Sequence, residues 1–289
     1  MGGRCSPGRV VQTNENEMTT DSLLELSHVS KRFGGLSAVA DVSLRVRDGQ
    51  IKAVIGPNGA GKTTLFNLIG GALPLSEGTV RFEGRTLNGL KPHVVAALGI
   101  SRTFQTAQVF PNMSIVENVM VGRHCRSRAG FFRAALHTRG MRQEEGRIRE
   151  EAERWLAYTG VTGGYDSPPG DLPFVIHRKV EIARALATEP RLLLLDEPAA
   201  GLNIRETEEM GNLIRRIRDH GIPVLIIEHD MSLVMEISDE VFVLDFGCKI
   251  AEGTPKEIQK NEEVIAAYLG KENHSRAANH ESGEFPGQG

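Results

Sequence analysis

Several features that would narrow the class of this protein at once are missing from its sequence. Only three of its 289 residues are cysteine, and the positions of Cys5, Cys125 and Cys248 predict neither a metal site nor a disulfide framework. No apolar run approaches the roughly 18 residues of a membrane-spanning helix, and residues 1–20 lack the apolar segment of a secretory signal. The net charge of −3 gives no sign of a surface dedicated to nucleic acid. These absences favour a globular chain in a reducing cytoplasm, acting at a membrane only through a partner.

Strand-like and helix-like segments alternate along most of the chain. Short strands are expected at 23–29, 38–46, 50–55, 79–82, 100–104, 192–195, 224–227 and 241–244, and helices at 62–70, 141–159 and 204–220. This alternation predicts an α/β sheet with parallel elements. We therefore expect one α/β domain at 21–270, with a helical subdomain inserted at roughly 85–170. The polar stretches 1–20 and 271–289 are expected to be disordered tails.

A Gly-rich loop stands between the apolar segment 50–55 and the helix that follows it. The loop matches GxxxxGK[ST] without a mismatch. Its residues, with the next one, are Gly56, Pro57, Asn58, Gly59, Ala60, Gly61, Lys62, Thr63 and Thr64. Glycines allow such a loop to point backbone N–H groups at phosphate oxygens, and the start of the helix adds positive potential. The sequence therefore predicts a phosphate site, with Lys62 on the β- and γ-phosphates and Thr63 on Mg²⁺.

A second motif consists of two carboxylates at the end of an apolar strand. The four leucines at 192–195 lead directly into Asp196 and Glu197. Asp196 is expected to hold Mg²⁺, directly or through water, and Glu197 to polarise the attacking water. An apolar strand followed by Asp-Glu is common by itself, so the interpretation depends on the phosphate loop upstream.

These motifs and several spaced residues resemble the ABC ATPase family over nearly all of residues 22–270. The resemblance implies a P-loop NTPase core with a mixed sheet and an inserted helical subdomain, which binds and hydrolyses ATP as a dimer. It also implies that Phe33 stacks on adenine, that Gln105 senses Mg²⁺ and the attacking water, and that His229 contacts the γ-phosphate. Residues 199–203 would contact the opposite subunit. Taken singly, Phe33 could be a core aromatic, Gln105 a surface residue and His229 a hydrogen-bonded histidine at a strand end. A GTPase is disfavoured because the sequence has no Asn-Lys-x-Asp.

Several longer sequence segments resemble those of the ATP-binding subunits of branched-chain amino-acid importers. The segments that carry this likeness are 33–39, 102–105, 181–187, 196–203, 250–255 and 264–270. The resemblance implies a second, related ATPase as partner, with a homodimer left open, together with two membrane permeases and an extracytoplasmic binding protein. The chain would then lie on the cytoplasmic face of the inner or plasma membrane. A urea or short-amide importer, a lipid exporter and a non-transport ABC ATPase remain alternatives.

One family motif is altered. The segment before 181–187 should read Leu-Ser-x-Gly-Gln, but this chain begins it with Leu172 and Pro173 and continues through Phe174, Val175 and Ile176. Proline lacks both a hydroxyl and an N–H donor, and valine stands where glycine would let the backbone approach phosphate. In the family this segment binds the γ-phosphate held by the opposite subunit. We therefore expect asymmetric ATP sites, in which the partner's nucleotide meets the impaired segment.

Overall fold

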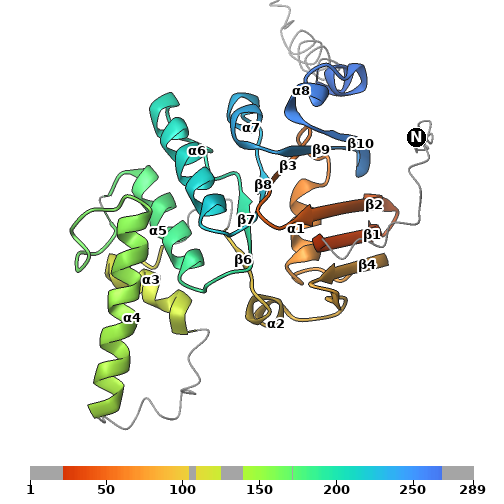
Figure 1. Cartoon of the computed structure of the whole chain (residues 1–289). Helices are drawn as coiled ribbons and strands as arrows, with labels where there is room; N and C mark the ends of the chain where they lie inside the picture. Colours follow the sequence, from red (N-terminus) through yellow and green to blue (C-terminus); the bar gives the residue numbers. More distant parts are fainter. Residues whose placement is uncertain (1–21, 104–108, 125–138, 171, 269–289) are drawn as a thin grey trace, which may run out of the picture.

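The computed structural model describes residues 22–103, 109–124, 139–170 and 172–268 (Figure 1). The expected tails at 1–20 and 271–289, and Gln105, lie outside these ranges. Within them, the structure contains two sheets and helices that cover or separate them. This mixed α/β architecture confirms the predicted fold class.

The larger sheet carries the predicted motifs. Its six described strands have the order β10-β9-β3-β8-β7-β6, and all neighbours are parallel except β10 and β9. The strands are β3 (Ile51–Ile55), β6 (Ile100–Arg102), β7 (Leu192–Asp196), β8 (Val224–Ile227), β9 (Glu240–Asp245) and β10 (Cys248–Gly253). Every residue of β3, β7 and β8 is buried, because helices or the second sheet cover both faces. Parallel strands covered in this way read as continuous apolar runs, as these do.

The smaller sheet is antiparallel, with the order β2-β1-β4-β5. Its described strands are β1 (Ser22–Phe33), β2 (Leu36–Arg47), β4 (Glu77–Phe82) and β5 (Arg85–Thr86). Helix α1 (Lys62–Ile69) lies between the two sheets, and its residues Leu65, Phe66 and Ile69 share one apolar core with both. The helix that follows the phosphate loop is therefore fixed from two sides.

A second core covers the other face of the larger sheet. Helices α6 (Ile204–Asp219) and α7 (Met231–Ile237) pack against the sheet there, and α8 (Pro255–Ile258) adds to this core near β10. Asn203 caps α6 through a reciprocal pair of bonds with Glu206, and Asp230 caps α7 by accepting from the Leu233 N–H. These caps fix the points at which the chain leaves the sheet edge and enters each helix.

Three helices form a third core at one end of the molecule (Figure 1). They are α3 (Ile115–His124), α4 (Arg139–Tyr158) and α5 (Phe174–Leu186). The limits expected for a helical subdomain, roughly 85–170, stay a prediction. Within that range the structure also places α2 (Pro92–Ala97) and β6, and β6 pairs with β7 in the larger sheet.

Two further findings concern expectations from composition. None of the described helices is both long and apolar enough to span a bilayer. Cys248, at the start of β10, is disulfide-bonded, which its place in the sequence did not indicate.

Candidate functional site

The phosphate loop connects the end of β3 to the start of α1 in the structure. Its lysine side chain is folded back over the loop, and Lys62 is only 7% exposed. Lys62 Nζ donates to the carbonyl oxygens of Gly56, at 2.6 Å, and Pro57, at 3.1 Å. The ammonium group is thus held inside the curl of the loop, with Asn58 and Gly59 exposed at its rim.

Two glycines of this loop are required by the close approach of other backbone. Gly56 has a φ of 149°, and a Cβ there would lie 1.9 Å from the Leu244 carbonyl oxygen. Gly61 has a φ of 105°, and a Cβ there would lie 2.4 Å from the Ala38 carbonyl oxygen. Gly61 is also the N-cap of α1, and no side chain caps that end. The loop is therefore shaped by contacts with β9 and β2, and its N–H groups suit phosphate.

Asp196 is the last residue of β7, and it is 1% exposed. Its Oδ2 accepts a hydrogen bond from Arg102 Nη2 at 2.8 Å. Its Oδ1 is buried and has no hydrogen-bond partner among the described residues. A buried carboxylate oxygen left unpaired is costly, and carboxylate and hydroxyl oxygens are what Mg²⁺ prefers. Together with the Thr63 hydroxyl, which lies exposed at the start of α1, this oxygen fits a Mg²⁺ site.

Glu197 and His229 come from neighbouring strand ends and approach each other. Glu197 has a φ of 50°, and its N–H donates to the Ile227 carbonyl oxygen of β8 at 2.9 Å. His229 Nδ1 lies 3.9 Å from Glu197 Oε2, and the imidazole is more than half exposed. Strands β3, β8 and β7 are consecutive in the sheet. The loop, Asp196, Glu197 and His229 are therefore gathered along one edge of the sheet, the edge formed by the carboxyl ends of these strands. Parallel sheets place ligand sites at this edge.

Glu228 also lies at this edge, although no sequence motif assigned it a role. It is fully buried, and its Oε1 accepts from the Ala199 N–H at 2.8 Å while its Oε2 accepts from the His229 N–H at 3.1 Å. Burial raises the pKa of its carboxyl, against the lowering effect of these bonds. Glu228 thus joins the loop after Glu197 to the segment that carries His229. The only sequence signal was a carboxylate directly after the apolar strand 224–227.

Of the remaining predicted residues, Phe33 and Thr64 are described by the structure and Gln105 is not. Phe33 ends β1, is 47% exposed, and has Lys31 Nζ 5.0 Å from its ring centroid. Thr64 follows Thr63 in the first turn of α1 and is half-buried. Gln105 cannot be placed, because it is not among the described residues. The structure therefore brings the loop, Asp196, Glu197 and His229 together, and leaves the roles of Phe33 and Gln105 as predictions.

The altered segment forms the start of α5. Pro173 is the N-cap and offers no side-chain cap bond. Phe174 is 43% exposed, with its ring 5.0 Å from the Arg178 guanidinium, whereas Val175 is only 9% exposed. The branched side chain of Val175 thus faces the chain's own interior. The substitutions presented at the exposed start of α5 are Pro173 and Phe174.

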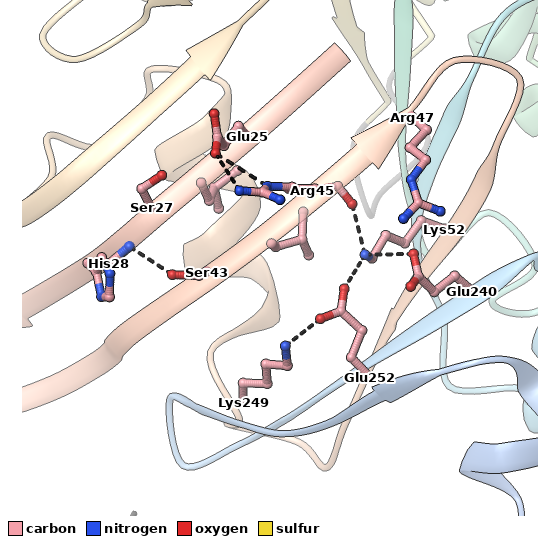
Figure 2. A pocket seen from close by; sticks show the side chains of 12 residues that line it. Glu25, Ser27, His28, Ser43, Arg45, Arg47, Lys52, Glu240, Lys249 and Glu252 are labelled. Carbon is pink, nitrogen blue, oxygen red and sulfur yellow. Dashed lines mark hydrogen bonds and ion pairs between the residues drawn. The ribbon is translucent and has the colours of Figure 1, made fainter. Parts of the chain in front are cut away.

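A hollow of about 580 Å³, to which the phosphate loop contributes no lining residue, lies beside β1, β2 and β10 (Figure 2). Its charged side chains bind one another. Lys52, near the start of β3 and 1% exposed, donates to the Arg45 carbonyl oxygen at 2.8 Å and to Glu240 at 3.0 Å, and it also contacts Glu252. Burial acts to raise the pKa of Glu240, but the attraction and hydrogen bond of Lys52 hold it below its ordinary value. This network joins β3 to β9 and β10.

Comparison with known proteins places these features in a family. A model described as ABC transporter matches residues 39–200, and one described as branched-chain amino acid ATP-binding cassette transporter matches residues 248–274. The high-affinity branched-chain amino acid transport ATP-binding protein BraF of Pseudomonas aeruginosa is 43% identical over 250 residues, which cover 86% of this chain and 98% of BraF. LivG of Escherichia coli (strain K12), which has the same description, is 41% identical over the same shares.

Solved structures agree with these relatives. The crystal structure of the ADP conformation of an ATP-binding cassette of an ABC transporter superposes with a TM-score of 0.76 at 33% identity, covering 86% of this chain and 99% of that one. A nucleotide-free cassette from an ABC transporter superposes with a TM-score of 0.75 at 32% identity, covering 86% and 98%. With the phosphate loop and the carboxylates at one sheet edge, and with relatives matched over nearly their whole length, this chain belongs to the ABC transporter family as one of its ATP-binding cassettes.

Proposed function

We propose that this chain is the ATP-hydrolysing subunit of an importer for branched-chain or other hydrophobic amino acids. The observation that carries the proposal is the convergence of the phosphate loop, Asp196 and the Glu197–His229 pair at the ends of three adjacent strands. The amino-acid class is supported by what BraF and LivG are described as transporting, and by the match of residues 248–274.

Different residues of the chain would bind the phosphates, the Mg²⁺ and the adenine of ATP. Lys62, now bound to the carbonyls of Gly56 and Pro57, would exchange these acceptors for the β- and γ-phosphate oxygens. Thr63 and Asp196 would hold Mg²⁺, which neutralises charge on the phosphates. Phe33 would stack on adenine.

The attacking water would be handled at the neighbouring strand ends. Glu197 would orient the water and accept its proton. Two carboxylates lie near His229, and that of Glu197 is more exposed than that of Glu228. His229, with its ring exposed, would donate to the γ-phosphate, and Gln105 would sense both Mg²⁺ and the water. Glu228 positions His229 by accepting from its N–H.

The proposal includes an assembly. The chain would pair with a second ABC ATPase subunit, either a related chain or a second copy, and rest on two permeases at the cytoplasmic face of the inner or plasma membrane. An extracytoplasmic binding protein would deliver the amino acid. The descriptions of BraF and LivG as transport ATP-binding proteins support this arrangement.

Within that assembly we propose that the two ATP sites are unequal. The partner's γ-phosphate would meet the start of α5, where Pro173 offers no hydroxyl and Phe174 stands exposed. Each charge-assisted hydrogen bond lost there weakens binding by about 1.5–3 kcal/mol, which is about tenfold or more in rate or affinity. The nucleotide bound by this chain meets the partner's corresponding segment instead and is hydrolysed normally.

The test is the ATPase activity of the transporter purified with its permeases and stimulated by the leucine-loaded binding protein. Glu197→Gln in this chain should reduce hydrolysis by about 100-fold, since a general base contributes roughly that much or more. The same change in the partner ATPase should leave much of the activity. Equal losses would disprove the asymmetry, and purification without permeases, or with ribosomes or DNA, would overturn the transport proposal.

A further inference from the structure

Arg102 is the last residue of β6, and its side chain reaches beneath the carboxylate of Asp196. Nη2 donates to Asp196 Oδ2 at 2.8 Å, and Nη1 donates to Asn67 Oδ1 at 2.7 Å. The guanidinium carbon also lies 5.6 Å from the centroid of the Phe66 ring. The arginine side chain is 14% exposed. It is therefore held on three sides by groups from β7 and α1.

This arrangement makes the two oxygens of Asp196 unequal. Oδ2 is occupied by a guanidinium whose planar fork fixes the direction of the bond. Oδ1 is buried and has no hydrogen-bond partner among the residues that the structure describes. The carboxylate is thus oriented so that one particular oxygen remains for another ligand.

The second anchor of Arg102 connects this carboxylate to the phosphate loop. Asn67 lies four residues after Thr63 on α1, so the two side chains share one face of the helix one turn apart. Arg102 therefore joins Asp196, at the end of β7, to the same helix face that carries the Thr63 hydroxyl. The two candidate oxygen ligands of Mg²⁺ are placed relative to each other through this one side chain.

We propose that Arg102 is a positioning residue for the metal site, which holds Asp196 Oδ2 so that Oδ1 is presented to Mg²⁺ or to its bound water. The inference rests on the proposed Mg²⁺ role of Thr63 and Asp196. It predicts that removing the arginine weakens metal binding, whereas the loss of its charge alone would strengthen it. A cation beside the site repels Mg²⁺, so removing the guanidinium would tighten metal binding if only its charge mattered, and weaken it if positioning dominates.

The test measures metal binding rather than hydrolysis. The full chain with bound ADP is titrated with Mn²⁺, which prefers the same oxygen ligands as Mg²⁺, and the free ion is followed by its paramagnetic resonance signal. Arg102→Met should weaken Mn²⁺ binding about 10–100-fold, the usual effect of losing a residue that orients a metal ligand. Arg102→Lys, which keeps the charge but loses the two-armed fork, and Asn67→Ala should weaken it in the same direction. ADP affinity in EDTA should stay within about twofold of wild type.

Arg191→Met is the matched control. Arg191 directly precedes β7 and pairs with Glu83 at 2.8 Å, but its side chain is 59% exposed and takes no part in the site. It should bind Mn²⁺ as wild type does. If Arg102→Met fails to fold by circular dichroism, Arg102→Lys and Asn67→Ala decide.

Three results would overturn the inference. Unchanged or tighter Mn²⁺ binding in the Arg102 variants would make the arginine a counter-charge only. Loss of ADP binding in EDTA equal to the loss of Mn²⁺ binding would make it merely structural. A wild-type chain that binds ADP but no Mn²⁺ would remove the proposed metal site itself, and the inference with it.

Discussion

At the scale of single residues, the site depends on buried groups that would not themselves touch ATP. Glu228 is fully buried and accepts one N–H from Ala199 and one from His229. The loop after Glu197 and the segment of His229 therefore share a single side chain as their acceptor. A residue of this kind sets the distance between two functional groups without reacting.

Glu228→Ala should lower the free energy of unfolding and slow hydrolysis together. Two buried N–H donors would lose their partner, at about 1–3 kcal/mol for each one left unsatisfied. Glu228→Gln keeps the shape and one acceptor, so its loss of stability should be smaller. Urea denaturation measures the first effect and ATPase activity at saturating ATP the second. If the alanine variant is as stable and as active as wild type, these bonds do not support the site.

At the scale of elements, three strands of the larger sheet are joined by ion pairs as well as by apolar packing. Lys52 of β3 is buried between Glu240 of β9 and Glu252 of β10, with Lys249 at the exposed side of Glu252 (Figure 2). An ion pair of this kind is weak evidence for extra stability, but removing one member leaves the others uncompensated. β3 is also the strand that leads into the phosphate loop, so its placement matters to the site.

Lys52→Met should destabilise the fold by about 3 kcal/mol, at the low end for a broken buried pair because both carboxylates keep some contact with solvent. Lys249 pairs with the same Glu252 from a position where its own side chain is 40% exposed, so Lys249→Met should cost no more than about 1 kcal/mol. Urea denaturation at neutral pH compares the two variants. Similar losses in both would show that burial of Lys52 adds nothing.

The same network predicts a dependence on pH. The pKa of Glu240 is lower in the fold than its ordinary value of 4.5. Its contribution to stability is therefore complete above pH 4.5 and is lost as the pH falls through the lower folded pKa. Lys52→Met removes the cause of that lowering, so the gap in stability between wild type and the variant should narrow on acidification. A gap that stays constant from neutral to acid pH would contradict this.

The elements around the phosphate loop could be predicted from sequence, because their signals are local. The expected strand 50–55 and helix 62–70 correspond to β3 and α1 within a residue. The partners of Lys52, Arg102 and Glu228 could not be predicted. Each binds residues distant along the chain, and hydrophobic periodicity does not say which strands become neighbours. β6 lies within the expected strand 100–104, but the sequence did not indicate that it pairs with β7 and forms an edge of the larger sheet as described.

At the scale of the whole molecule, the phosphate loop lies where the parts of the chain meet. Helix α1 is packed between the two sheets, and the loop before it contacts β2 at Ala38 and β9 at Leu244. The helical end of the molecule reaches the same edge through α5, where the Phe174 ring would lie 3.4 Å from a Cβ at Gly201, in the loop that follows Glu197. A ligand bound by this loop therefore stabilises a segment that contacts both sheets.

Binding of nucleotide should accordingly stabilise the whole chain against heat. At a concentration 100-fold above its dissociation constant, ADP with Mg²⁺ should add about 2.7 kcal/mol, which raises the Tm of a domain of this size by about 5–10 °C. Lys62→Ala should lose most of that rise, because a 100-fold weaker affinity leaves only about 0.4 kcal/mol at the same concentration. Lys256→Ala, at an exposed position outside the site, should keep it in full. Differential scanning calorimetry of the three proteins with and without nucleotide measures the shift, and an undiminished rise in Lys62→Ala would place the nucleotide elsewhere.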